Sequence, residues 1–133
     1  MIWLKSIGVV ILAFVVVGGL HVLTDFVLET SGTFPPPNSP AALGTGYLVI
    51  AAVYRNIYNV FGGWLTARLA PRAPVGHAIA LGLLGAVAAT GGTIAMWHLG
   101  AHWYPITLAV LALPSCWLGG WLGSKRTAEG AAA

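Results

Sequence analysis

The sequence predicts an all-α protein, a four-helix transmembrane bundle with both termini in the cytoplasm. Three observations predict it: an apolar composition, four apolar runs of membrane-spanning length, and basic residues confined to one side. Of the 133 residues, 58% are hydrophobic and only 7% are charged, whereas soluble domains carry about 25% charged residues. This composition excludes an ordinary soluble domain and leaves room for one compact membrane domain.

Each apolar run is long enough to cross a bilayer as a helix. About 20 residues at a rise of 1.5 Å each match a hydrocarbon core of about 30 Å. The predicted spans cover residues 3–27, 40–69, 74–99 and 104–123. We expect a single four-span domain over residues 1–126 and a short disordered cytoplasmic tail over residues 127–133.

Proline and glycine mark the breaks between the runs. Residues 31–40 contain three consecutive prolines and predict a stiff polyproline-type connector. Ser39 and Pro40 are typical of an N-cap and a first helical turn, so we expect the second helix to begin there. Residues 70–74 form a helix-breaking turn, and Pro114 predicts a kink inside the fourth span.

Basic residues predict the orientation. Lys5, Arg68, Arg72, Lys125 and Arg126 lie on one side of the predicted spans, and the other two connectors contain no lysine or arginine. By the positive-inside rule, this bias places both termini in the cytoplasm and the protein in the cytoplasmic membrane. The same residues account for the basic pI of 9.4, so we expect no nucleic-acid partner.

Two double glycines followed by tryptophan suggest an internal repeat. Gly62-Gly63-Trp64 ends the second span and Gly119-Gly120-Trp121 ends the fourth, at an offset of 57 residues. Two repeated helical hairpins would produce this pattern. Small residues that let helices approach closely would produce it without duplication. Both interpretations stay open at this point.

Arg55 is the one basic residue in the middle of an apolar run. A charge near the bilayer centre costs roughly 2.5 to 3.5 kcal/mol, so it needs a partner inside the bundle. Counting 1.5 Å per residue places Arg55 about 20 Å, His21 about 24 Å and Asp25 about 30 Å from the cytoplasmic side. An arginine side chain can extend along its helix by several ångström. We therefore expect Arg55 to pair with Asp25, with His21 as a hydrogen-bonding neighbour.

Further polar residues extend this cluster. Glu29 follows Asp25 by one helical turn, and Tyr58 lies close to Arg55 in sequence. Asn59, Gly62 and Thr66 continue from Arg55 along one helical stripe. The main interpretation is a structural clasp between two helices with a tightly packed stripe beneath it. The alternative is a gated or proton-linked site with a water-filled path.

Other reactive residues carry weaker signals. His98 and His102 are four residues apart and are candidate metal ligands, but Gly100 lies between them at a helix end. We interpret them as solvated interfacial histidines, and we expect no metal site and no cofactor. Cys116 is the single cysteine, which excludes an intramolecular disulfide. No motif pairs a nucleophile with a base, so we do not expect an enzyme.

The connector Phe34-Pro35-Pro36 and the turn Gly62-Gly63-Trp64-Leu65-Thr66-Ala67-Arg68-Leu69-Ala70-Pro71-Arg72 carry a resemblance. With these two motifs between its spans, nearly the whole chain resembles a small, uncharacterised family of four-span bacterial inner-membrane proteins. The resemblance implies the bacterial inner membrane and implies no particular function.

These observations predict a multi-pass inner-membrane protein without catalytic activity. We expect a helix-bundle module or a subunit of a membrane complex, with the lipid bilayer around it and a homo-oligomer or a larger complex as its partner. The alternative is a small transporter or channel that uses the Arg55, Asp25 and His21 cluster.

Overall fold

The computed structural model describes the backbone of residues 1–132; the side chains of residues 126–129 and 131–132 lie outside the description. Four α-helices and two short 3₁₀ helices make up this part of the chain. They are α1 (Ile2–Thr30), η1 (Pro40–Leu43), α2 (Thr45–Leu69), α3 (Pro74–Ala95), η2 (Trp97–Leu99) and α4 (Trp103–Ala132). The all-α prediction is therefore confirmed.

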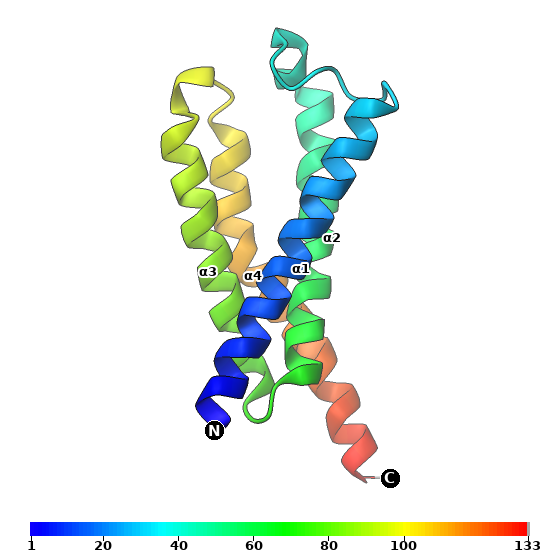
Figure 1. The fold of residues 1–133 in the computed structure, drawn as a ribbon, viewed down its shortest axis with the longest axis vertical. Coiled ribbons are helices and arrows are strands. Elements are labelled where there is room, and N and C mark those ends of the chain that lie inside the picture. Colours follow the sequence, from blue (N-terminus) through cyan, green and yellow to red (C-terminus); the bar gives the residue numbers. More distant parts are fainter. Residues whose placement is uncertain (133) are drawn as a thin grey trace.

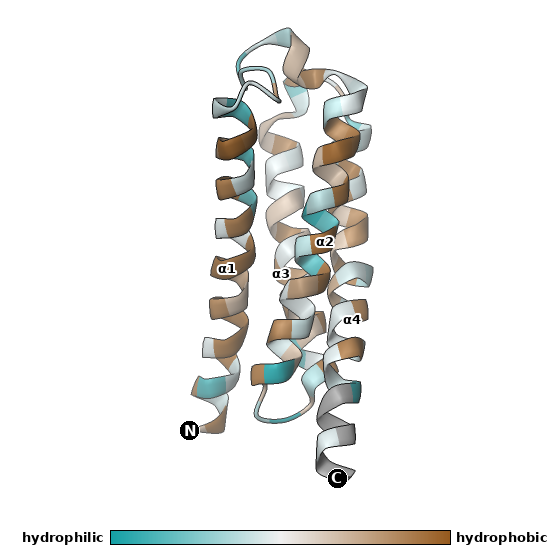
Figure 2. Cartoon of the chain, turned by 90° about the vertical axis from the view of Figure 1, so that its right-hand side faces the viewer, coloured by the Kyte–Doolittle hydropathy of each residue, from teal (hydrophilic) through white to brown (hydrophobic). Residues whose placement is uncertain are grey.

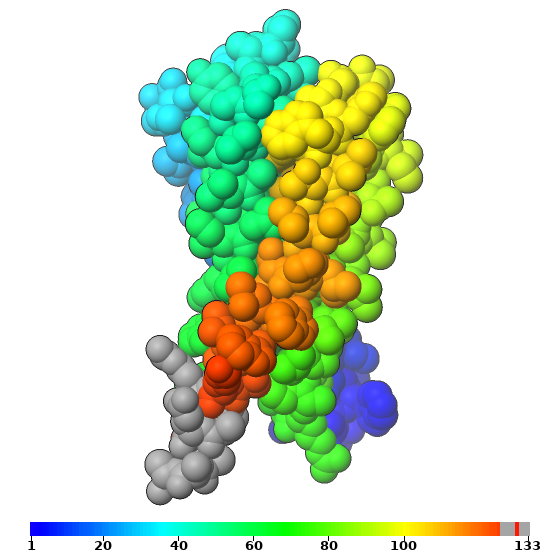
Figure 3. Space-filling model, turned by 180° about the vertical axis from the view of Figure 1, so that it is seen from behind, coloured from blue at the N-terminus to red at the C-terminus, as the bar shows by residue number. Residues whose placement is uncertain are grey.

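The helices run alternately up and down (Figure 1). Helices α1 and α3 start at the end that holds both termini, and α2 and α4 return to it. The pairs α1–α2 and α3–α4 lie closer at this terminal end and diverge toward the opposite end. Seen from behind, α2 and α4 meet in one continuous surface (Figure 3), and α4 packs extensively against both α2 and α3.

Three helices of the described chain are long and apolar enough to cross a membrane: α1, α3 and residues Trp103–Lys125 of α4. Helix α2 is not among them. It carries the polar stretch of residues 54–59, visible as teal bands in Figure 2. Helix α1 is much less buried than α2, because its only buried residues are Ala13 and Val17. Most of its apolar side chains point outward, as a helix surrounded by lipid requires.

Glycines allow α2 and α4 to cross at close range. A Cβ atom at Gly63 would collide with the backbone of Cys116, and one at Gly119 would collide with the backbone of Val60. A Cβ atom at Gly120 would instead meet Ala78 of α3. In α2 the second glycine of the pair faces α4, whereas in α4 the first glycine faces α2. The two pairs are therefore not placed equivalently, and the internal repeat stays a prediction.

Two helix boundaries differ from the expectation. Ser39 and Pro40 introduce η1 and not the second long helix, and the Ser39 hydroxyl donates to the carbonyl of Pro36. Helix α2 begins only at Thr45, because Gly44 adopts an extended conformation that separates the two. At the other end, the third long helix stops at Ala95 and η2 covers residues 97–99.

The fourth helix is longer than expected. It continues as one α-helix through Pro114 and ends at Ala132. Its backbone therefore covers most of residues 127–133, which we expected to form a disordered tail. Most side chains of that segment are outside the described residues, and the disorder of the tail stays a prediction.

Candidate functional site

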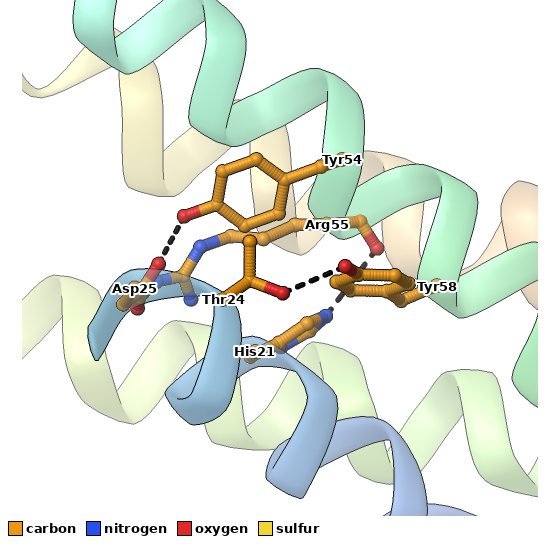
Figure 4. Close-up of polar contacts among 6 residues, drawn as sticks. All are labelled: His21, Thr24, Asp25, Tyr54, Arg55 and Tyr58. Atoms are coloured by element: carbon orange, nitrogen blue, oxygen red, sulfur yellow. Dashed lines mark hydrogen bonds and ion pairs between the residues drawn. The ribbon is translucent and has the colours of Figure 1, made fainter. Parts of the chain in front are cut away.

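Arg55 and Asp25 form an ion pair between α2 and α1 (Figure 4). The Nη2 group of Arg55 donates to Oδ2 of Asp25, and the Tyr54 hydroxyl donates to Oδ1. Both carboxylate oxygens are thus occupied, and the charges of the pair cancel. The side chains of Arg55 and Asp25 remain 25% and 30% exposed. The pair is therefore partly accessible and is not sealed within a tightly packed core.

Further polar contacts join the same two helices. His21 Nε2 lies 3.4 Å from the carbonyl oxygen of Arg55, and the hydroxyl groups of Thr24 and Tyr58 are 2.6 Å apart. Thr24 and Asp25 follow His21 by three and four residues, which places both beside His21 on the side of α1 that faces α2. These contacts hold α1 against α2 in the half of the molecule away from the termini.

A cavity of about 610 Å³ lies beside the ion pair, and residues of all four α-helices line it. The polar lining residues are His21, Asp25, Glu29, Tyr47, Tyr54, Arg55, Asn59 and Tyr104. Most other lining residues are apolar. At the terminal end the lining includes Leu81 and Cys116, which belong to the buried cluster with Ala13. The cavity therefore ends where the helices pack tightly.

Small residues border the cavity on α1 and α3. Gly18 and Gly92 both line it, and a Cβ atom at either position would meet no described atom within 4 Å beyond the adjacent backbone of its own helix. Ala88 of α3 also lines it and is exposed. Residues of both α1 and α3 thus border the cavity, and the two helices diverge toward the end of the molecule away from the termini (Figure 1).

The proline-rich connector lines the cavity at the end of the bundle where the helices diverge, which we call the wide end. Phe34 contributes an aromatic ring there, 5.4 Å from the ring of Tyr47 in an edge-on arrangement. Glu29 lines the same cavity, and its carboxylate has no ion pair or hydrogen bond among the described residues. The Nε atom of Arg55 is buried and also lacks a hydrogen-bond partner there. Two polar groups at this site thus remain available.

The lower part of the predicted polar stripe is packed. Thr66 is fully buried, and its hydroxyl donates to the carbonyl of Gly62 at 2.6 Å. Gly62 lies against Val17 and Leu81. Of the three stripe residues that follow Arg55, only Asn59 lines the cavity. The packing interpretation therefore holds for Gly62 and Thr66, whereas Asn59 extends the polar wall.

The outer histidines lie apart from the ion pair. The ring of His102 stacks on Trp97 with centroids 3.7 Å apart, and its Nε2 lies 2.8 Å from the Trp97 carbonyl oxygen. Within the described residues, no three His, Cys, Asp or Glu side chains gather as metal ligands would. The pattern His98-x-x-x-His102 does not mark a helical face, because Gly100 has a positive φ of 83° and ends η2 between them.

Sequence reasoning missed three members of this site. Tyr54, Thr24 and Tyr104 were not assigned to the cluster from the sequence, yet Tyr54 and Thr24 form its hydrogen bonds and Tyr104 lines the cavity. Whether the Tyr54 hydroxyl reaches the Asp25 carboxylate depends on the rotation of α2 relative to α1, which the local sequence does not specify. Nothing in the local sequence distinguishes an inward tyrosine at position 104 from a lipid-facing one.

No family model matches the chain, and no curated protein and no solved structure matches it either. Its function must therefore be argued from the cavity and the residues on its walls.

Proposed function

We propose that the chain is a four-span protein of the bacterial cytoplasmic membrane with both termini in the cytoplasm. Helices α1 and α3 start at the same end (Figure 1), so if both cross the membrane, α2 must cross back between them. Its 25 residues extend about 37 Å, which is enough. Its polar residues lie on the cavity wall and against neighbouring helices, where they avoid lipid.

The distribution of basic residues supports this orientation. Lys5, Arg68, Arg72 and Lys125 all belong to the terminal end of the molecule, and the connectors at the opposite end contain neither lysine nor arginine. Under the positive-inside rule the terminal end is cytoplasmic. The wide end of the cavity then faces the extracytoplasmic side.

Within this frame the protein is a non-catalytic module that binds a small amphipathic molecule. The observation that carries this proposal is the cavity itself: about 610 Å³, largely apolar, with a polar cluster on one wall. Ligand sites typically enclose about 300 to 1,000 Å³ and combine an apolar lining with a few polar groups. Arg55 and Asp25 satisfy each other's charges, which suits positioning of a ligand better than proton transfer.

Binding can be tested by filling the cavity. Purified protein is titrated with the neutral amphipath 4-octylphenol, and bound copies are counted by native mass spectrometry. The wild type should bind one copy saturably. Gly18→Leu should abolish this binding, because the new side chain enters the cavity. Gly19→Leu should leave it intact, because Gly19 has equal space around it but does not line the cavity.

The paired glycine variants separate binding in the cavity from adsorption to the lipid-facing surface. Adsorption would be unsaturable and equal in all three proteins. That result, or equal binding by Gly18→Leu and Gly19→Leu, would refute the proposed function.

A small transporter is the second candidate, and the one-sided shape of the cavity favours it. The cavity reaches the wide end but stops at the cluster of Ala13, Leu81 and Cys116. A transporter must open this closure in a second conformation. A cysteine on the cavity wall, such as Ala88→Cys, would then react with impermeant reagents from either side of the membrane. Reaction from the extracytoplasmic side alone supports a binding module.

A further inference from the structure

The charges on the cavity wall do not balance. Two carboxylates, Asp25 and Glu29, line it together with one guanidinium, Arg55. Asp25 is neutralised by Arg55, and its second oxygen accepts the Tyr54 hydroxyl. Glu29 has no such partner in the described chain. With His21 neutral, the wall carries a net charge of −1, located at Glu29.

The unpaired carboxylate lies in an aromatic setting. Glu29 is one helical turn beyond Asp25, about 6 Å further along α1 toward the wide end. The backbone N–H of Phe34 donates to the carbonyl of Leu28, the residue before Glu29, and the Phe34 ring contacts Tyr47, which also lines the cavity. Aromatic faces attract organic cations, and a nearby carboxylate supplies the counter-ion.

We propose that the ligand of this cavity is an amphipathic organic cation. The inference rests on the proposed binding function and adds the charge of the ligand to it. The cationic group would lie near Glu29 and the aromatic pair, and the apolar body would extend between α1 and α3 along Gly18 and Gly92. An anion would meet two carboxylates and a guanidinium already neutralised by Asp25. The unpartnered Nε of Arg55 can be satisfied by water or by a neutral oxygen of the ligand.

Two ions of equal shape and opposite charge test this inference. Tetraphenylphosphonium and tetraphenylborate are each measured by equilibrium dialysis against purified protein in matched detergent. Binding to Gly18→Leu is subtracted, which removes uptake by the micelle. We expect the cation to bind at least about tenfold more tightly than the anion. Glu29→Gln should remove most of this preference while 4-octylphenol still binds, because the substitution keeps the shape and removes the charge.

The outcomes separate the two proposals. If octylphenol binds in the cavity but the borate binds as tightly as the phosphonium, the cation inference is wrong and the binding function stands. The same holds if Glu29→Gln leaves the preference unchanged. If neither octylphenol nor either ion distinguishes the wild type from Gly18→Leu, the binding function itself fails.

Discussion

At the scale of single residues, Arg55 is accommodated in an apolar stretch of α2 by a partner on the neighbouring helix. Its guanidinium reaches across to Asp25 on α1, and Tyr54 holds the other oxygen of that carboxylate. The pairing could be anticipated from the sequence, because helical rise alone brings the two residues to compatible depths. The role of Tyr54 could not, because it depends on the rotation of α2 relative to α1.

Breaking the ion pair should cost more than removing it. Arg55→Ala leaves the Asp25 carboxylate without its counter-charge, and loss of one partner of a buried pair costs roughly 3 to 5 kcal/mol. We expect a smaller loss here, about 1 to 3 kcal/mol, because both side chains are partly exposed. Folded yield and thermal unfolding in detergent would measure it.

The double variant Arg55→Met with Asp25→Leu is the control for that experiment. It removes both charges and should recover most of the lost stability. An Arg55→Ala protein as stable as the wild type would show that the pair does not hold α1 to α2.

At the scale of helices, close approach of α2 and α4 shapes the molecule. The glycines at the crossing bring the two backbones together in the terminal half, and the helices diverge beyond it. The runs between the proline and glycine breaks predicted all four long helices, although only three of them are long and apolar enough to cross a membrane. The predicted start of α2 was wrong. Ser39 and Pro40 begin the short helix η1, and the extended backbone at Gly44 separates it from α2.

Alanine at the crossing glycines should disrupt this packing. In Gly63→Ala and Gly119→Ala the new methyl group meets backbone atoms that cannot move aside, so each should destabilise the fold by at least about 1 to 3 kcal/mol. Gly91→Ala is the matched control, because its added methyl group meets no described atom within 4 Å beyond the adjacent backbone of its own helix. Thermal unfolding of the three variants compares them. Equal midpoints would exclude close packing of α2 against α4.

At the scale of the whole molecule, divergence of the helices creates the cavity. Sequence periodicity indicates which face of a helix is polar, but not where two helices separate. That separation depends on the volumes of side chains at the crossing points. For this reason Arg55 and Asp25 were predicted as a static clasp, and the open space beside them became evident only in three dimensions.

Reporter fusions test the proposed orientation. A fluorescent protein that matures only in the cytoplasm should fluoresce when fused after Ala133, and alkaline phosphatase should be active when inserted at Asn38 in the connector before α2. The expectation follows from the basic residues at the terminal end. An active phosphatase at the C-terminus and an inactive one at Asn38 would indicate the opposite topology, with both termini outside the cytoplasm.

We propose that the cavity is accessible to water and ligand, lies within the membrane and opens away from the cytoplasm. Two adjacent residues of α3 test it most directly: Ala88 lines the cavity, whereas Val87 is 69% exposed on the outer surface that lipid would cover. In a Cys116→Ala background, Ala88→Cys and Val87→Cys are treated with an impermeant methanethiosulfonate from the extracytoplasmic side.

Only a hydrated thiol ionises to the reactive thiolate. We therefore predict that Ala88→Cys reacts at least about tenfold faster than Val87→Cys, because a thiolate in hydrocarbon is strongly disfavoured. Equal rates at the two positions, or reaction of Ala88→Cys only from the cytoplasmic side, would contradict the account.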